Sequence, residues 1–202
     1  MVILHRLEKL TNTKYLNLYW AELENDKTKI NYYIASRRKQ EDLAINTHKI
    51  VSDSVRILPY FFDETGKMKV IIIKEYRYPV GQFLYTLPAG GIEKGEDIDH
   101  AVVRELREEV GAKLIKAERF EPVSYISAGL TDEAITPYIA EVELDGKAEL
   151  EDNEIIETHV IDFDELSDFL DNNEFCMESR LLLRTFYYKT KLELLEKIVA
   201  KG

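Results

Sequence analysis

The chain contains 202 residues, of which 45% are hydrophobic and 32% are charged. That apolar share suits one globular domain, or one domain with a small appendage, and is too high for a disordered chain. The net charge of −11 disfavours nucleic acids and anionic membranes as partners, but clustered carboxylates would suit divalent cations. The apolar runs are too short for a transmembrane helix, and the N-terminus does not resemble a secretory signal. The single cysteine, Cys176, rules out an internal disulfide and favours the reducing cytoplasm.

Strand and helix patterns alternate along the chain. Short apolar runs bounded by turn residues predict strands at 15–24, 29–36, 55–62, 69–76, 83–87, 112–119, 121–126, 135–144 and 155–161. Apolar residues at helical spacing predict helices at 97–110, 164–172 and 178–200. Many strands with few helices predict an α+β fold, in which helices pack on a mixed sheet.

The first two predicted strands form an N-terminal β extension. A polar segment from Arg37 to Ser54 follows them, and we place a soft domain boundary there. The predicted domains are residues 1–50 and residues 51–202. Because an isolated two-stranded hairpin is marginal in water, we expect residues 1–50 to be buried against a partner subunit in a homodimer.

The most informative stretch is the predicted helix 97–110. At about 100° per residue, it places Glu105, Glu108 and Glu109 in one arc of about 100°. A separate arc carries apolar residues that we expect to anchor the helix: Val102, Val103, Leu106 and Val110. Like charges at this spacing repel by a few tenths of a kcal/mol per pair. A solvated acidic face is one interpretation, and a site for a hard divalent cation, Mg²⁺ or Mn²⁺, is the other.

The residues around this helix resemble the signature of the Nudix hydrolases. The match consists of Gly90, Glu96, Arg104-Glu105-Leu106, Glu108-Glu109 and Gly111 at the family's spacing. Ala112 departs from it, because the family prefers a bulkier aliphatic residue there. The resemblance implies a Nudix-type α/β/α sandwich with a mixed sheet, and Mg²⁺- or Mn²⁺-dependent cleavage of a nucleoside diphosphate linked to another group.

Two further segments resemble the ADP-ribose pyrophosphatase branch of that family. In the first, Arg77 stands twelve residues before Ala89 of a Leu-Pro-Ala-Gly turn; the branch uses this arginine for substrate phosphate and this alanine's carbonyl for metal. In the second, residues 127–133 match a loop that closes over substrate and ends in a candidate general base, Glu133. Ala128 replaces the usual proline of that loop.

The resemblance therefore implies a set of site residues. The implied metal ligands are Ala89, Glu93, Glu105, Glu108 and Glu109, with Glu96 in support. The implied catalytic residues are Glu133, Glu108 and Arg104, of which Arg104 orients the glutamates through salt bridges. The implied substrate-binding residues are Arg77, Arg38, Arg37, Ser127 and Gly129.

The sequence leaves several functions open. The first candidate is Mg²⁺-dependent hydrolysis of a nucleoside diphosphate sugar, above all ADP-ribose, to a nucleoside monophosphate and a sugar phosphate. GDP-mannose or a dinucleotide is an alternative substrate, and a Nudix-fold sensor that binds a nucleotide without cleaving it is an alternative function. Base recognition leaves no fixed pattern: aromatic residues such as Tyr32 are expected mostly in the core, although one could stack on adenine.

Overall fold

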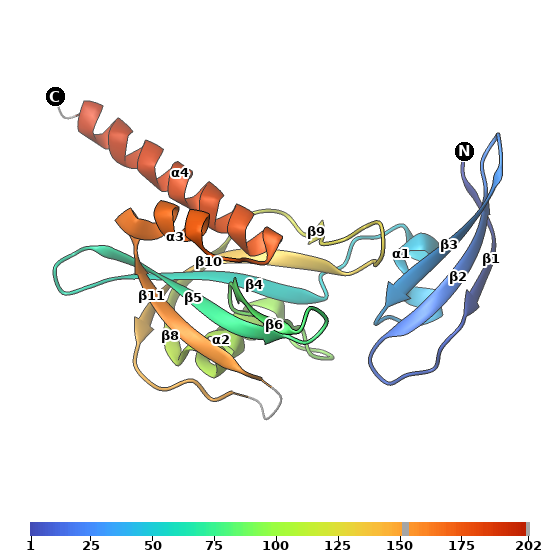
Figure 1. The fold of residues 1–202 in the computed structure, drawn as a ribbon, viewed down its shortest axis with the longest axis horizontal. Helices are drawn as coiled ribbons and strands as arrows, with labels where there is room; N and C mark the ends of the chain where they lie inside the picture. Colours follow the sequence, from blue (N-terminus) through green and yellow to red (C-terminus); the bar gives the residue numbers. More distant parts are fainter. Residues whose placement is uncertain (151–153, 201–202) are drawn as a thin grey trace. The chain divides into compact units, whose positions relative to one another are not determined.

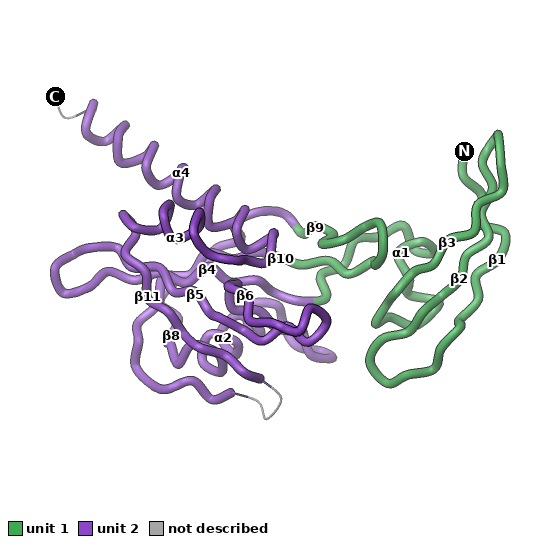
Figure 2. Tube along the Cα trace, in the orientation of Figure 1, with its two compact units in different colours: residues 1–53, 123–135 green, residues 54–122, 136–202 purple. Residues whose placement is uncertain are grey.

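The computed structural model describes residues 1–150 and 154–200, which form two compact units (Figures 1 and 2). Unit 1 contains Met1–Asp53 and Val123–Ile135, and unit 2 contains Ser54–Pro122 and Thr136–Gly202. The sequence analysis had placed all of 123–135 with the second domain. The division at residue 50 and its role in dimerisation stay predictions.

Unit 1 is built on a three-stranded antiparallel sheet in the order β1-β2-β3: β1 (Ile3–Lys9), β2 (Asn17–Glu24) and β3 (Lys29–Ser36). The turn between β2 and β3 forms as predicted, because Asn25 Oδ1 accepts backbone hydrogen bonds from Lys27 and Thr28, both at 2.9 Å. Strand β1 was not predicted. Its charged residues interrupt the apolar alternation, and its strand conformation comes from pairing with β2, with a register shift between Leu4 and Arg6.

The rest of unit 1 consists of short elements. The polar segment after β3 contains the 3₁₀ turn η1 (Gln40–Asp42) and the short helix α1 (Ala44–Thr47). The strand predicted at 121–126 is reduced to β9 (Ser124–Tyr125), which pairs with the first residues of β10. Arg38 fastens these pieces together: its Nε and Nη2 donate to Asp53 at 3.0 and 2.6 Å, and its Nη1 lies 3.8 Å from Asp132.

Unit 2 is built on a sheet whose central path runs β11-β5-β4-β10-β8, with β6 paired to β5 and β7 paired to β4. Its strands are β4 (Ser54–Phe62), β5 (Met68–Arg77), β6 (Gln82–Thr86), β7 (Ala89–Gly91), β8 (Ala112–Arg119), β10 (Ala134–Leu144), which begins in unit 1, and β11 (Ile156–Asp162). Four consecutive residues of β5, from Val70 to Ile73, are fully buried, as expected for a strand covered on both faces.

Helices cover both faces of this sheet (Figure 1). They are α2 (Ile98–Glu105), continued by the π-helical turn η2 (Leu106–Val110), then η3 (Phe163–Glu165), α3 (Leu166–Asn172) and α4 (Met177–Val199). Ile71 packs with α2 and η2 on one face, whereas Ile72 packs with α3 and α4 on the other, because successive strand residues point to opposite faces. The predicted α+β class with an α/β/α sandwich is confirmed.

Two predicted apolar faces are only partly buried. Val103 is 46% exposed, so the prediction that it anchors the helix is wrong: it lies at the edge of the apolar arc, beyond the contact with the sheet. In α4, Phe186 is buried, but the predicted apolar positions Leu192, Leu195 and Val199 are exposed, because the helix extends past the core.

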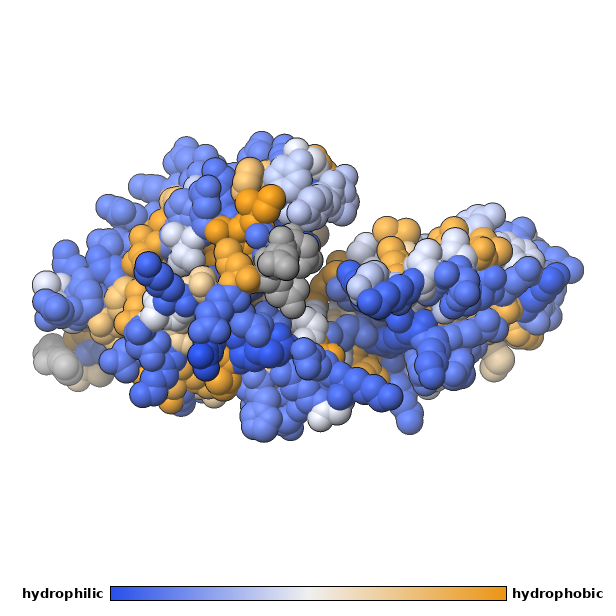
Figure 3. Space-filling model, turned by 90° about the horizontal axis from the view of Figure 1, so that it is seen from below, coloured by the Kyte–Doolittle hydropathy of each residue, from blue (hydrophilic) through white to orange (hydrophobic). Residues whose placement is uncertain are grey.

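Other exposed apolar residues are scattered over the chain. Hydrophilic residues cover most of the face drawn in Figure 3, and hydrophobic residues gather in patches between them. No helix in the described part of the chain is long and apolar enough to cross a membrane.

Gly111 ends the π-helical turn and offers a test of this part of the fold. Its φ is +67°, and a Cβ built there would lie 2.6 Å from the backbone carbon of Lys147. We expect Gly111→Ala to lower the free energy of unfolding, measured with urea, by about 1–2 kcal/mol for the left-handed backbone and by a further 1–3 kcal/mol, roughly, for crowding. Gly66→Ala is the control, because Gly66 has a φ of +78° but nothing within 4 Å of its Cβ position. Equal losses in the two variants would contradict the packing against Lys147.

Candidate functional site

The carboxylates of the helix α2 and turn η2 are mostly buried. Glu105 is 5% exposed and Glu109 is 3% exposed, while Glu108 is half-buried. The interpretation of a solvated acidic face is therefore wrong for two of the three acids. Their arc adjoins the apolar arc, and both arcs face the sheet of unit 2.

The two buried carboxylates lie against the backbone of strand β7. The Ala89 backbone N–H donates to Glu109 Oε2 at 2.9 Å. A Cβ built on Gly90 would lie 1.6 Å from Glu105 Oε1, so the Glu105 carboxylate occupies the space that a side chain at Gly90 would need. The Pro-Ala-Gly turn thus supplies a donor at one residue and an empty space at the next. β7 itself is held by β4, with Arg56 opposite Ala89 and Val55 opposite Gly90.

Arg104 joins the other acids to this pair. Its Nη1 lies 2.5 Å from Glu105 Oε1 and 3.1 Å from Glu108 Oε2, and its Nε lies 3.0 Å from Glu96 Oε1. Its Nη2 donates to the Gly91 carbonyl at 2.8 Å. One guanidinium therefore ties the loop before α2 to the helix and to β7. The Glu93 side chain is exposed, and its backbone N–H donates to Glu96 Oε2 at 2.8 Å.

Burial determines the electrostatics of the pair. Burial raises the pKa of Glu109 well above its usual range, against the Ala89 hydrogen bond, and the neighbouring Glu105 carboxylate adds to the increase. Burial also raises the pKa of Glu105, although Arg104 opposes it. At the partly buried Glu96, by contrast, the Arg104 hydrogen bond lowers the pKa. Glu105 and Glu109 are thus two neighbouring acids whose ionised forms would be stabilised by a further positive charge.

The donor set of this pair fits a hard divalent cation. Carboxylate and carbonyl oxygens are the ligands that Mg²⁺ and Mn²⁺ prefer, and Glu105, Glu109 and the backbone of Ala89 supply them. Within residues 1–150 and 154–200, no group of three or more His, Cys, Asp or Glu side chains is arranged to hold a metal ion. Arg104 instead contacts Glu96, Glu105 and Glu108 at once. The metal roles of these residues stay predictions.

The residues predicted to bind substrate divide between the two units. In unit 2, Arg77 ends β5, and its Nη1 lies 2.6 Å from Glu75 Oε1. Glu75 in turn is one of the charges that raise the pKa of Glu109. The other predicted substrate-binding residues belong to unit 1: Arg37, Arg38, Ser127 and Gly129. The predicted general base, Glu133, belongs to unit 1 as well. Arg37 is exposed, whereas Arg38 is engaged with Asp53.

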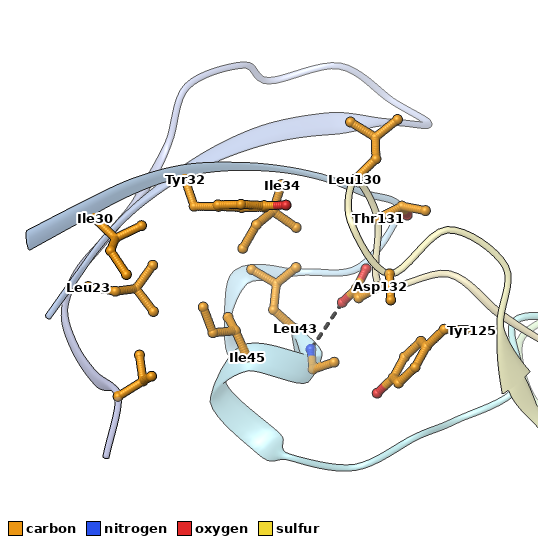
Figure 4. Close-up of a pocket in the computed structure, with 13 residues that line it drawn as sticks. Leu23, Ile30, Tyr32, Ile34, Leu43, Ile45, Tyr125, Leu130, Thr131 and Asp132 are labelled. Atoms are coloured by element: carbon orange, nitrogen blue, oxygen red, sulfur yellow. Dashed lines mark hydrogen bonds between the residues drawn. The ribbon is translucent and has the colours of Figure 1, made fainter. Parts of the chain in front are cut away.

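Unit 1 also contains an apolar pocket of about 430 Å³ (Figure 4). Strands β2 and β3, helix α1 and the loop around Leu130 contribute to its wall, which includes the rings of Tyr32 and Tyr125. The Tyr32 hydroxyl donates to the Gly129 carbonyl at 2.6 Å, and Asp132 Oδ2 accepts from the Ala44 N–H at 3.0 Å. The sequence analysis missed this pocket, because its wall comes from segments about 90 residues apart and no local pattern signals it.

The chain is similar to known proteins over much of its length. The family described as NUDIX domain matches residues 53–180. The ADP-ribose pyrophosphatase of Bacillus subtilis (strain 168) is 32% identical over 115 residues, which make up 54% of this chain and 60% of that protein. The ADP-sugar pyrophosphatase of Mus musculus is 32% identical over 128 residues, or 63% of this chain and 56% of that protein. The matches thus span little more than half the length of these curated relatives.

A solved structure shares the fold over almost the whole chain. The crystal structure of an ADP compounds hydrolase superposes with a TM-score of 0.70 at 15% sequence identity, covering 94% of this chain and 95% of that one. At this level of identity, the similarity shows the fold alone.

The space above Gly90 gives a direct test of the carboxylate pair. We expect Gly90→Ala to push the Glu105 carboxylate out of its place and to weaken Mn²⁺ binding, measured by titration calorimetry, by about tenfold or more. The free energy of unfolding should change little, because the displaced carboxylate moves towards water. Gly146→Ala is the matched control, since its Cβ would lie at an ordinary 3.8 Å from the Gly111 carbonyl oxygen. Unchanged Mn²⁺ binding in Gly90→Ala would remove Glu105 from the metal ligands.

Proposed function

Because the chain belongs to the Nudix family, we propose that it is a divalent-cation-dependent hydrolase that cleaves the pyrophosphate bond of a nucleoside diphosphate linked to a sugar. ADP-ribose is the first candidate substrate, and the products would be a nucleoside monophosphate and a sugar phosphate. The observation that carries the proposal is the buried carboxylate pair of Glu105 and Glu109 against the backbone of β7.

The relatives support the substrate class. The two curated relatives are named for ADP-ribose and for ADP-sugars, and the solved structure for ADP compounds. The site residues that resemble the ADP-ribose pyrophosphatase branch are Arg77, the last residue of β5, and Ala89, the first residue of β7. A nucleoside diphosphate sugar is therefore a better candidate than a nucleoside triphosphate.

Several of the predicted site residues in unit 2 can be given a task in this reaction. A divalent cation bound there would neutralise charge on the diphosphate and make water a stronger nucleophile. Glu105, Glu109 and the Ala89 carbonyl would hold it, and Arg104 would keep Glu105 in place through its 2.5 Å contact. Arg77 would bind phosphate oxygens, because a guanidinium donates two parallel hydrogen bonds to such a group.

Residues of unit 1 complete the proposal. Glu133 would take the proton from the attacking water, because a carboxylate can act as a general base. Its backbone N–H donates to Thr131 Oγ1 at 3.1 Å, which orders the end of the loop that carries it. Arg37 is the exposed candidate for a second phosphate or ribose contact, and the apolar pocket with Tyr32 and Tyr125 suits a flat nucleobase.

Alternatives within the family differ in substrate or in catalysis. GDP-mannose or a dinucleotide would need the same carboxylates and a different base pocket. A non-catalytic nucleotide sensor would not need the complete acidic set that is present here at Glu105, Glu108 and Glu109. We further propose a homodimer, in which a partner subunit covers the exposed apolar residues of unit 1, and a cytoplasmic location.

A substrate panel tests the proposed function. The chain would be assayed with ADP-ribose, GDP-mannose, other nucleoside diphosphate sugars and dinucleotides, with Mg²⁺ or Mn²⁺, and read out by phosphate release after phosphatase treatment. We expect ADP-ribose to give the highest kcat/KM. Glu109→Gln should keep the fold and lose most turnover, because it removes an ionised ligand at nearly constant volume.

The control for that variant is Glu118→Gln, which removes an exposed carboxylate at the end of β8. Near-normal turnover of Glu109→Gln at saturating Mg²⁺ would contradict the metal site. Tight binding of a nucleotide without any phosphate release from wild-type protein would favour the sensor.

Glu133 can be tested separately from the metal site. We expect Glu133→Gln to lower kcat by about 10²–10⁴ with little change in KM, as for loss of a general base. Mn²⁺ affinity should be unchanged, because the acids of α2 and η2 remain. An intact kcat would transfer the role of base to Glu108 or Glu93, and a large change in Mn²⁺ affinity would make Glu133 a metal ligand.

A further inference from the structure

A buried arginine lies on the opposite face of unit 2's sheet from the carboxylate pair. Val55 and Ile57 of β4 pack with α2, so Arg56 between them points towards α4. Arg56 is only 8% exposed. A buried guanidinium is costly unless it is paired and hydrogen-bonded, and an apolar residue would fill the same place in a strand at lower cost. The presence of an arginine at this buried position therefore suggests a role besides packing.

The Arg56 guanidinium binds the turn that leads into β7. Its Nη1 donates to Thr86 Oγ1 at 2.8 Å and to the Leu87 carbonyl at 3.2 Å. Its Nη2 lies 3.3 Å from Glu178 Oε1, in the first turn of α4. The buried Nε of Arg56 has no hydrogen-bond partner among the described residues. The contacts of Nη1 and Nη2 are therefore the ones that link Arg56 to this turn and to the start of α4.

Two more groups hold the same turn. Ser179, which is fully buried, lies 2.9 Å from Thr86 Oγ1 through its hydroxyl and accepts from the Leu87 N–H at 3.2 Å. The Ile57 N–H donates to the Pro88 carbonyl at 2.8 Å. The turn of Thr86, Leu87 and Pro88 is thus fastened to β4 and to α4, immediately before Ala89.

Ala89 connects this turn to the carboxylate pair. Its N–H donates to Glu109 Oε2 at 2.9 Å from the other side of the sheet. The backbone between Thr86 and Ala89 is therefore held from the α4 face by Arg56 and Ser179 and from the α2 face by Glu109. A shift of the turn would move the Ala89 peptide relative to the Glu109 carboxylate.

We propose that Arg56 is a positioning residue for the metal site, acting with Ser179 and Glu178 through the Thr86–Pro88 turn. The proposal rests on the proposed function in one respect, namely that Glu109 and the Ala89 backbone are metal ligands. Residues that orient metal ligands typically change metal affinity or activity by about 10–100-fold when they are replaced. If Arg56 only joins α4 to the sheet, its replacement would change the free energy of unfolding without changing metal affinity.

The test compares Arg56→Met with Arg56→Lys and with Lys69→Met. Methionine keeps the length of the side chain and removes the charge and the hydrogen bonds. Lys69 is the matched control, because it is a largely buried cation of the same sheet that pairs with Asp162 and Asp63, away from the turn. The measurements are Mn²⁺ affinity by titration calorimetry, amide hydrogen exchange at Leu87 and Ala89, and the free energy of unfolding in urea.

We expect Arg56→Met to weaken Mn²⁺ binding by about 10–100-fold and to speed exchange of the Leu87 and Ala89 amides. Arg56→Lys should recover part of the affinity, because an ammonium can still donate to the Leu87 carbonyl and Thr86. Lys69→Met should change neither Mn²⁺ affinity nor exchange at the turn, whatever its effect on stability. If Arg56→Met does not fold, Ser179→Ala removes one fastening alone and should give the same two changes at smaller size.

Wild-type affinity for Mn²⁺ in Arg56→Met, or in Ser179→Ala where the former does not fold, would overturn the inference and leave the proposed function intact. Failure of the wild-type protein to bind Mn²⁺ would overturn both.

Discussion

Burial of two carboxylates side by side is the constraint on which unit 2 depends. Neighbouring acids in a place with little water favour their neutral forms, unless donors or cations stabilise the charge. Arg104 stabilises the charge of Glu105, and the Ala89 N–H stabilises the charge of Glu109. The strand that supplies the donor also supplies the space, since only a residue without a side chain leaves room for the Glu105 carboxylate at Gly90. A divalent cation would provide the positive charge that these partners leave incomplete.

The sheet lets both faces contribute to this arrangement. β7 is a three-residue strand, too short to hold its own position, and it pairs with β4 over Ser54, Val55 and Arg56. On one face the helix α2 and turn η2 bring Glu105 and Glu109 to it. On the other face Arg56 and the start of α4 hold the preceding turn. The core residues that join these layers therefore also determine where the candidate ligands lie.

Unit 1 supplies different chemistry. Its pocket is apolar and its wall carries two tyrosine rings, whereas the carboxylate site of unit 2 is charged. Arg38 pairs with Asp53 and Asp132 and holds the short elements of unit 1 together, and its contact with substrate stays a prediction. Arg37, its neighbour, is the better candidate for a ligand contact, because its side chain is exposed.

The sequence by itself determined most of the elements and the family. Apolar periodicity located most strands and all three long helical segments within a few residues, and the spacing from Gly90 to Gly111 identified the acids and Arg104, because both signals are local. Only the tertiary structure decided that Glu105 and Glu109 are buried, that residues 3–9 form a strand, and that Arg56 and Ser179 reach the turn before Ala89. Each of these depends on contacts between segments far apart in the chain, which no local pattern encodes.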